Sequence, residues 1–288
     1  MTKTRISFEF FPPQTLDAAF RLWETVQHLA PLAPSFVSVT YGAGGTTRKL
    51  THDAVTTIGR NYGLNVAAHL TCVDATRAET LEIAQGYANA GVIEIVALRG
   101  DAPQGAERFT AHADGFANSV ELVAALAETG RFNLRVGAYP ERHPYADGAD
   151  ADVIWLKRKL DAGATSAITQ FFFEAETFFR FRDRCEKAGI TAPIIPGILP
   201  ITSWDGARRF AARCGAHVPA RLDEAFATAR RDGREDLLAL THATQLCDRL
   251  IEGGVEDLHF YTLNRPQMTR NVCHALGLVP DAALEKVA

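Results

Sequence analysis

Short runs of apolar, mostly β-branched residues alternate with longer amphipathic stretches along the whole chain. The runs are almost wholly apolar, which is typical of parallel strands that are covered on both faces. This pattern favours an α/β fold built on a parallel sheet. The predicted strands are Ile6–Phe10, Phe36–Thr40, Val66–Leu70, Ile93–Leu98, Leu134–Ala138, Ala167–Phe171, Ile194–Ile198 and Leu258–Tyr261.

The stretches between these runs have the periodicity of helices that cover such a sheet. Repeated strand–helix units without a break in composition predict a single (β/α)8 TIM barrel over residues 1–288, with a doubly wound sheet as the alternative. The interval before the last strand is long, so we expect an extra helix there, near Pro219–Thr228. The other predicted helices are Leu16–Leu29, Arg77–Ala90, Ser119–Glu128, Asp152–Ala162, Thr177–Ala188, Asp236–Gly253 and Met268–Leu276, the last followed by Gly277 as its C′ residue.

The composition limits the classes of function. The chain has 288 residues, 22% of them charged, and a net charge of −4 without a basic run, so neither nucleic acid nor a membrane is an expected partner. It begins without the apolar core of a signal peptide, and its five scattered cysteines form no CxxC pair, so we expect a cytoplasmic protein with reduced thiols. The nine histidines include no HExxH motif, and no metal site is expected.

Polar residues follow the predicted strands at their carboxyl ends. In a (β/α)8 barrel these ends form one rim, which is where active sites lie. Polar groups from most of the strands would therefore meet at one site. They are Glu9, Thr40, Tyr41, His69, Thr71, Arg99, Asp101, Tyr139, Glu141, His143, Gln170, Asn264 and Arg265.

Three short motifs near this rim have more than one interpretation. The stretch YGAGGTT at 41–47 lacks both the GK[ST] ending of a P-loop and the GxGxxG spacing, and is either a turn with a Thr N-cap or a close approach of backbone to a ligand. RGD at 99–101 is either a surface ion pair or two charges at the barrel mouth, which the buried strand before it favours. LKRK at 156–159 is either a solvated helix face or a phosphate site formed by Arg158 and Lys159.

Several segments in combination resemble the bacterial methylenetetrahydrofolate reductase family. They run in the family's order from residue 7 to 265: SFEFFPP, FVSVTYGAGGTTR, AHLTC, ALRGD, YPERHP, LKRKLDAGA, ITQFFFE, PIIPGILPI and HFYTLNR. The resemblance implies a flavoprotein barrel in which FAD carries a hydride from NADH or NADPH to 5,10-methylenetetrahydrofolate, giving 5-methyltetrahydrofolate by a ping-pong scheme. It also implies a homo-oligomer without the C-terminal regulatory domain of the eukaryotic relatives.

The resemblance assigns roles to individual residues. Glu9 in SFEFF matches the general acid that protonates N10 of the folate, and a carboxyl among Phe side chains is expected to resist ionisation; the alternative is a carboxylate paired with a barrel Arg or Lys. Asp101 matches a fixed negative charge that stabilises the N5 iminium cation. Gln170 and Phe210 match contacts shared by folate and nicotinamide, and Arg265 matches a folate contact.

The remaining assignments concern the flavin. Trp155 stands where the family often has Asn, Gly206 where it often has Gln, and Phe116 where it often has Tyr, so contacts with FAD and folate are expected to differ there. The residues that fall where the family holds FAD are Thr40, Tyr41, Ala43, His69, Leu98, Arg99, Gly100, Asp101, Ala117, Tyr139, His143, Ala146, Asp152, Trp155, Arg158 and Lys159.

Three other functions remain as alternatives. A flavin-independent reductase of the same family would lack the flavin-binding His, RGD and basic-helix residues that this chain keeps. A folate- or flavin-binding protein without catalysis would have no need of an acid at Glu9. An unrelated flavin barrel such as a proline dehydrogenase would not share the specific motifs. NADH and NADPH both remain open as donors, because the chain has no Rossmann fingerprint with its ribose-reading acid.

Overall fold

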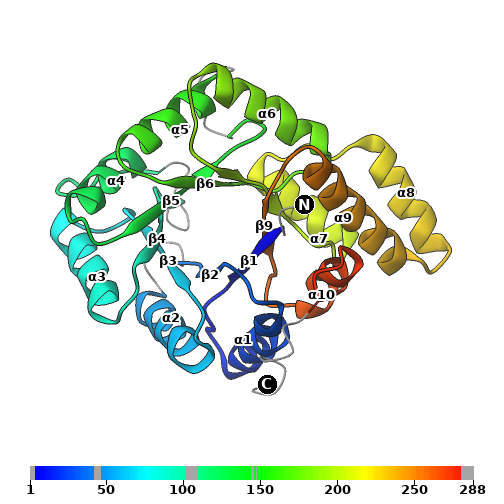
Figure 1. The fold of residues 1–288 in the computed structure, drawn as a ribbon, viewed down its shortest axis with the longest axis horizontal. Coiled ribbons are helices and arrows are strands. Elements are labelled where there is room, and N and C mark those ends of the chain that lie inside the picture. Colours follow the sequence, from blue (N-terminus) through cyan, green and yellow to red (C-terminus); the bar gives the residue numbers. More distant parts are fainter. Residues whose placement is uncertain are drawn as a thin grey trace.

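The computed structural model describes residues 4–41, 47–101, 109–143, 146, 148 and 150–279. Parallel strands form a ring at its centre in the order β7-β6-β5-β4-β3-β2-β1-β9-β8, and helices surround the ring (Figure 1). The (β/α)8 prediction is confirmed. The strands are β1 (Arg5–Phe10), β2 (Phe36–Val39), β3 (Val66–Thr71), β4 (Glu94–Leu98), β5 (Asn133–Ala138), β6 (Ser166–Thr169), β7 (Ile194–Ile195), β8 (Gly197–Ile198) and β9 (Asp257–Tyr261).

β7 and β8 are two halves of the predicted seventh strand, separated by Pro196. β7 pairs with β6, and β8 pairs with β9. Backbone hydrogen bonds continue across the junction, because the amide of His259 donates to the carbonyl oxygen of Pro196 at 3.0 Å and that of Ala167 donates to Pro193 at 2.9 Å. The short segment 193–198 therefore joins the two edges of the sheet and closes the ring.

The helices lie where the periodicity predicts them, with two additions, of which the first is Arg48–Tyr62 after the Gly-rich stretch. Between β8 and β9 the chain forms three helices, of which α8 is the predicted extra helix and α7 is not predicted. The helices are α1 (Leu16–Leu29), α2 (Arg48–Tyr62), α3 (Arg77–Asn89), α4 (Ser119–Glu128), α5 (Ala151–Asp161), α6 (Ala175–Lys187), α7 (Trp204–Cys214), α8 (Ala220–Arg231), α9 (Glu235–Glu252) and α10 (Pro266–Ala275), with a 3-10 turn η1 (Ala30–Leu32) after α1.

Local sequence explains where several helices begin. Thr15 accepts a hydrogen bond from the amide of Ala18 at the start of α1, and Asn118 caps α4 by accepting from Val120. Thr76 and Glu79 form a capping box at the start of α3. Such caps satisfy amides that the first helical turn leaves without partners.

Side chains alternate between two sides of each strand, and this alternation separates Glu9 from its Phe neighbours. Phe8 and Phe10 are fully buried in the cluster between the strands and the outer helices, together with Phe260. Ser7 and Glu9 point to the other side, into the barrel, since successive side chains of a strand face opposite ways. The apolar part of the barrel interior consists of Phe36, Ala67, Val96, Ile168 and Ile195.

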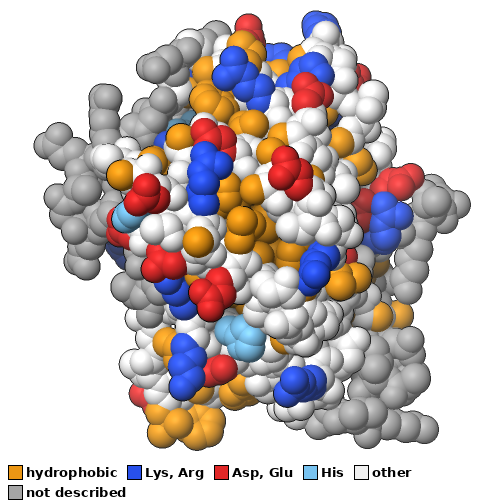
Figure 2. All heavy atoms as spheres, turned by 90° about the vertical axis from the view of Figure 1, so that its left-hand side faces the viewer, with side chains coloured by type: hydrophobic (Ala, Val, Ile, Leu, Met, Phe, Trp, Pro, Cys, Tyr) orange, Lys and Arg blue, Asp and Glu red, His pale blue; other side chains and the backbone are white. Residues whose placement is uncertain are grey.

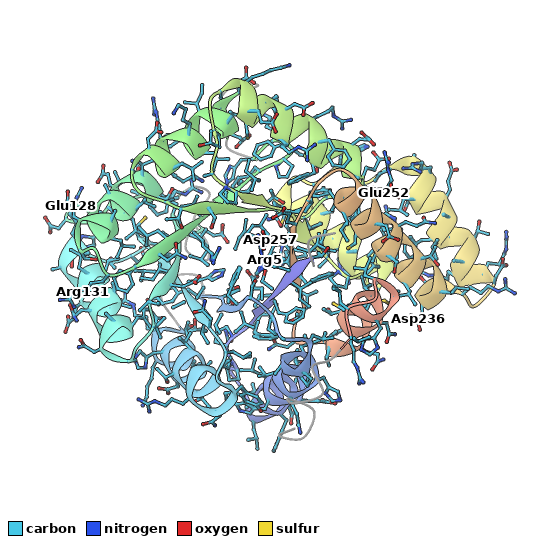
Figure 3. All side chains as sticks on the ribbon, in the orientation of Figure 1. Arg5, Glu128, Arg131, Asp236, Glu252 and Asp257 are labelled. Atoms are coloured by element: carbon cyan, nitrogen blue, oxygen red, sulfur yellow. The ribbon has the colours of Figure 1, made fainter. Side chains whose placement is uncertain are left out.

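Ion pairs occupy the amino-terminal end of the barrel. Arg5 on β1 donates two hydrogen bonds, of 2.7 and 2.6 Å, to Asp257 on β9 (Figure 3). Deeper inside, Arg135 forms a buried ion pair of 2.7 Å with Glu94. Both contacts tie neighbouring strands together at the end opposite the rim, and they leave the rim for ligands.

The outer surface is mixed in charge. Figure 2 shows Lys, Arg, Asp and Glu side chains interspersed over one side of the molecule, around smaller apolar areas. None of the helices in the described part of the chain combines the length and apolar character needed to cross a membrane.

Candidate functional site

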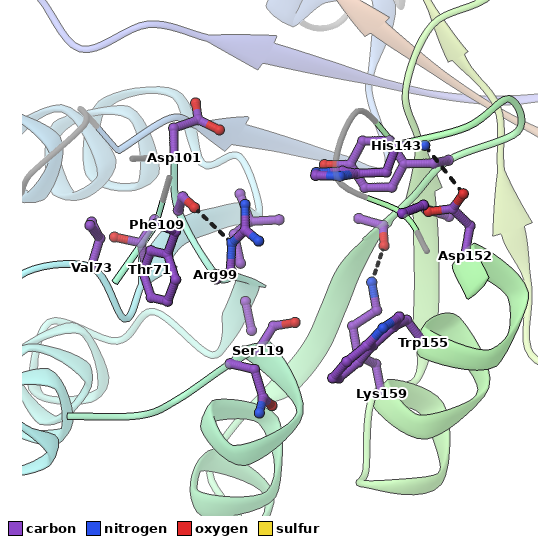
Figure 4. A pocket seen from close by; sticks show the side chains of 18 of the residues that line it. Thr71, Val73, Arg99, Asp101, Phe109, Ser119, His143, Asp152, Trp155 and Lys159 are labelled. Carbon is purple, nitrogen blue, oxygen red and sulfur yellow. Dashed lines mark hydrogen bonds between the residues drawn. The ribbon is translucent and has the colours of Figure 1, made fainter. Parts of the chain in front are cut away.

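A cavity of about 510 Å³ opens at the carboxyl ends of β3, β4 and β5 and beside α5 (Figure 4). Most residues that the resemblance assigns to FAD line it: Tyr41, Leu98, Arg99, Gly100, Asp101, Ala117, Tyr139, His143, Ala146, Asp152, Trp155 and Lys159. Thr71, predicted at the rim, also lines it, and residues not predicted from the sequence complete its wall: Val73, Ala97, Phe109, Asn118, Ser119, Gly137 and Ala138. Ala43 lies outside the described residues.

One wall of the cavity is the face of α5. Asp152, Trp155 and Lys159 are three and four positions apart, so they lie on the same side of the helix. Lys159 is 8% exposed, and its ammonium donates to the carbonyl oxygen of Gly137. Burial lowers the pKa of Lys159 to about 8, although the nearby Asp152 raises it. The wall therefore holds a cation that burial disfavours and that an anionic ligand would stabilise.

Arg158 does not line the cavity. Its guanidinium lies 5.2 Å from the centre of the ring of Trp155, a residue that lines the cavity, and packs against that ring. Lys157, its neighbour, is exposed and bonds to Asp161 at 2.9 Å. Of the basic residues in LKRK, only Lys159 reaches the cavity, because successive residues splay around a helix.

The facing wall is the Arg99–Gly100–Asp101 turn, whose two charged residues both line the cavity mouth. Arg99 lies 5.0 Å from the centre of the Phe109 ring. Gly100 has a φ of +90°, and a side chain there would approach Val73 and Thr71 at 3.0 to 3.1 Å. Only glycine suits that position, which places the two charges on either side of it at the mouth.

Tyr139 and His143 form the end of the cavity beyond β5. Their rings meet edge to face, with centres 4.5 Å apart. Burial and the charge of Asp101 raise the pKa of Tyr139 to about 12, and burial and Arg99 lower that of His143. Both side chains are therefore neutral near pH 7 and act as polar, uncharged contacts.

Glu9 does not line this cavity but lies within the barrel, with a side chain 14% exposed. Its Oε2 is 3.4 Å from Nε2 of His69 on β3 and 3.8 Å from Nε2 of His259 on β9. Burial raises the pKa of Glu9, but the interactions with His259 and His69 are larger together and lower it to about 2. The expectation that its Phe neighbours keep this carboxyl from ionising is wrong, because those rings lie on the other side of the sheet.

The alternative interpretation paired Glu9 with a barrel Arg or Lys. In the described structure the groups nearest to its carboxyl are instead two histidines. His69, expected at the flavin, stands instead beside Glu9 and does not line the cavity, and neither does Thr40. His259 was not predicted as a site residue. A signal for it existed in HFYTLNR, because a two-residue period in that strand turns His259 and Tyr261 inward together.

The rest of HFYTLNR fixes the end of β1. The hydroxyl of Thr262 donates to the carbonyl oxygen of Glu9 at 2.6 Å. The side-chain amide of Asn264 forms two hydrogen bonds with the backbone of Phe11. Its oxygen accepts from the Phe11 N–H and its nitrogen donates to the Phe11 carbonyl oxygen, each at 2.9 Å. The segment that follows the last strand therefore fixes the backbone from Glu9 to Phe11.

Three predicted substrate residues, Gln170, Phe210 and Arg265, do not line the cavity. Gln170 follows β6, and its side-chain oxygen accepts from the amide of Phe171 at 3.0 Å. The Phe171 ring is 5.1 Å from that of Phe210 on α7. Arg265, after β9, donates to Thr202 before α7 at 3.3 Å. Phe210 thus lies on α7, a helix that the sequence analysis did not predict.

The three departures from the family differ in consequence. Trp155 presents an accessible ring to the cavity. Phe116 is buried beneath the guanidinium of Arg77, 4.7 Å away, and does not line the cavity. A side-chain carbon at Gly206 would meet only Ser203, at 3.6 Å, so a larger residue has room there. Within the described ranges no group of three or more His, Cys, Asp or Glu side chains could hold a metal ion.

Comparison with known proteins identifies the family. The model of the methylenetetrahydrofolate reductase family matches residues 1–277. The chain belongs to this family. Among reductases of the family, the 5,10-methylenetetrahydrofolate reductase of Pectobacterium carotovorum is 44% identical over 98% of this chain and 93% of its own length, and that of Escherichia coli is 45% identical over 96% and 91%. An Arabidopsis methylenetetrahydrofolate reductase (NADH) is 32% identical, and the match spans half of its length.

Solved structures of low identity share the fold. A Clostridium thermocellum protein that binds two copies of 5-methyl-5,6,7,8-tetrahydrofolic acid has a TM-score of 0.60 and 13% identity over 95% of this chain and 94% of its own. A 2,3-dimethylmalate lyase of the PEP mutase/isocitrate lyase superfamily has a TM-score of 0.55 and 11% identity, over 99% and 90%. Both agree with the barrel architecture of the methylenetetrahydrofolate reductase family.

Proposed function

We propose that this protein reduces 5,10-methylenetetrahydrofolate to 5-methyltetrahydrofolate, with NADH or NADPH as the hydride donor and FAD as the carrier. The observation that carries the proposal is that most of the residues assigned to FAD line one cavity at the rim of the barrel, among them Asp101, which is also assigned to the folate. Membership of the methylenetetrahydrofolate reductase family supports the substrate and the reaction.

The cavity suits a ligand with both anionic and aromatic parts. The buried ammonium of Lys159 would hold a phosphate group, and the accessible ring of Trp155 offers a surface for stacking. Gly100, which lacks a side chain, lets backbone form part of the wall. When bound, FAD would supply the redox chemistry, accepting a hydride from the nicotinamide and delivering it to the folate.

Two carboxylates serve the folate. A proton from Glu9 would go to N10, so that the bond between N10 and the one-carbon unit breaks and leaves a cation at N5. Asp101, at the cavity mouth, would stabilise this cation by its fixed negative charge. Glu9 must therefore carry a proton when the folate binds, and the two imidazoles beside it determine whether it does.

The remaining residues position the substrates. Phe171 links Phe210 and Gln170, because its ring contacts the ring of Phe210 and its amide donates to the side chain of Gln170. A ring and an amide can contact either a nicotinamide or a pterin, which supports one place that the two substrates occupy in turn, and hence a ping-pong scheme.

The test uses the purified protein with FAD under anaerobic conditions. We expect a yellow flavin spectrum that NADH or NADPH bleaches and that 5,10-methylenetetrahydrofolate then restores. Formation of 5-methyltetrahydrofolate is measured in the same mixture. A protein that takes up no FAD, or a bleached flavin that the folate fails to restore, would contradict the proposal.

A further inference from the structure

A line of buried polar contacts leads from the backbone of β9 to Glu9. The hydroxyl of Ser7 lies 3.3 Å from the carbonyl oxygen of Leu258 and 2.8 Å from Nδ1 of His259. The other ring nitrogen of His259, Nε2, lies 3.8 Å from Oε2 of Glu9. Ser7 and His259 are 1% and 0% exposed, and they face each other in the register of β1 and β9.

The single proton of the Ser7 hydroxyl restricts how this line is bonded. If Ser7 donates to the carbonyl oxygen of Leu258, its oxygen is free to accept a hydrogen from Nδ1 of His259, and both contacts are hydrogen bonds. If Ser7 donates to Nδ1 instead, its oxygen faces that of Leu258 without a proton between them. Buried polar groups are normally all bonded, so the first arrangement is favoured.

We propose that Ser7 holds His259 in the tautomer with its hydrogen on Nδ1, and that this tautomer favours the protonated form of the Glu9 carboxyl. The bare Nε2 then lies 3.8 Å from the Glu9 carboxyl, where its lone pair repels the carboxylate and so favours the acid. His259 and Ser7 are positioning residues, and Glu9 is the acid. The inference rests on the proposed function, in which the Glu9 O–H bond breaks, an N10–H bond forms, and Glu9 regains one proton from solvent in each turnover.

The charges around His259 support a neutral ring. Burial lowers its pKa, and so do His69 on β3 and Arg135 on β5, against the raising effect of Glu9. Arg135 lies 3.9 Å from the centre of the Phe36 ring, which stacks on His259 with centres 5.6 Å apart. A neutral imidazole has one N–H only, and the partner of Nδ1 therefore decides what Nε2 offers to Glu9.

The other groups that face Glu9 do not take over this role. Tyr261 on β9 keeps its proton, because burial and the charge of Glu9 raise its pKa, and its hydroxyl donates to Thr169 at 2.6 Å. β2 contributes Ser38, which has no charge. Interactions with both His259 and His69 lower the pKa of Glu9, and the proposed tautomer of His259 removes the N–H from one of them.

The tautomer can be read directly in the unaltered holoprotein. Nitrogen NMR of protein labelled with ¹⁵N-histidine distinguishes a protonated from a bare ring nitrogen, and the signals of His259 are those lost in His259→Gln. We expect the hydrogen on Nδ1 near neutral pH. A hydrogen on Nε2 alone, or on both nitrogens, would overturn the proposal.

A pair of matched variants tests the consequence for the reaction. Ser7→Ala removes the acceptor of the Nδ1 hydrogen, whereas Ser38→Ala removes the same atom from a buried serine on the neighbouring strand, whose hydroxyl has no hydrogen-bond partner. For Ser7→Ala we expect reoxidation by the folate to slow by about 10-fold near neutral pH and its pH profile to move to lower pH, with flavin reduction changed by less than about two-fold. Ser38→Ala should match the parent in both.

The outcomes separate this inference from the proposed function. An unchanged folate pH profile in Ser7→Ala would overturn the inference while the reaction itself stands. A parent protein whose reduced flavin the folate cannot reoxidise would overturn the proposed function, and the NMR result would still decide the tautomer. If Ser7→Ala does not fold, the NMR of the parent decides the inference alone.

Discussion

The ammonium of Lys159 and the carbonyl oxygen of Gly137 form a hydrogen bond across the wall of the cavity, from α5 to β5. A buried ammonium with one carbonyl partner and a lowered pKa is poorly compensated in the protein alone. The proposed FAD would add the negative charge that this site lacks. Three of the following predictions depend on the pairing of charges at the rim, and one on the proton of Glu9.

Lys159→Met should weaken FAD binding without unfolding the protein. Met has nearly the shape of the Lys side chain and no charge, so packing should survive while the attraction for a phosphate is lost. We expect the dissociation constant for FAD to rise about 10-fold or more, equivalent to about 1.4 kcal/mol. The matched control is Lys157→Met, the same change on the exposed side of α5, for which titration of the apoprotein with FAD should give the parent value.

The stability of the apoprotein should rise with pH between about 8 and 10.5 because of Lys159. Its pKa is about 8 in the folded protein, against an ordinary value of 10.5. Within this window the unfolded chain binds the proton and the folded protein does not, so raising the pH favours folding. Urea unfolding of parent and Lys159→Met should show a steeper rise for the parent; equal slopes would mean that the ammonium is well solvated.

Asp101→Asn should slow the folate half-reaction more than the reduction of the flavin. The loss of a fixed negative charge affects cation formation by a few kcal/mol at most, about the scale of one preorganised contact. Stopped-flow measurement of the two half-reactions decides this. Equal losses in both would instead point to weakened FAD binding, because Asp101 also lines the cavity.

Glu9→Gln should separate the two half-reactions. Gln keeps the size of the side chain but has no acid proton for N10, so reoxidation of the flavin by the folate should fall by about 10²–10⁴-fold or more. Reduction by NADH needs no such proton and should continue near the parent rate. Menadione, an acceptor that needs no ring opening, should still reoxidise the flavin; normal reoxidation by the folate would mean that another residue is the acid.

The barrel could be predicted from the sequence because its strands repeat a local signal, an apolar run followed by an amphipathic helix. The helix α7 was not predicted, although Trp204, Ala207 and Ala211, which are three and four positions apart and buried, carry the same helical signal. The cavity wall on α5 could be predicted only in part, since LKRK does not reveal by itself which basic residue turns inward.

The surroundings of Glu9 show why contacts are harder to predict than elements. In sequence its neighbours are Phe8 and Phe10, yet a strand turns adjacent side chains to opposite faces. Its contacts in the folded protein, His69 and His259, are distant along the chain and meet it only because parallel strands bring them into one ring.

The clasp between Asn264 and Phe11 joins residues separated by 253 positions. The proposed acid is therefore synthesised well before His259, Thr262 and Asn264, which hold it in place. At about 5–20 residues per second, roughly 10–50 s of synthesis separate the two. Throughout that time the nascent chain carries Glu9 without its surroundings, so catalytic competence appears only when the last strand docks. Turnover is thus a direct indicator that the ring has closed.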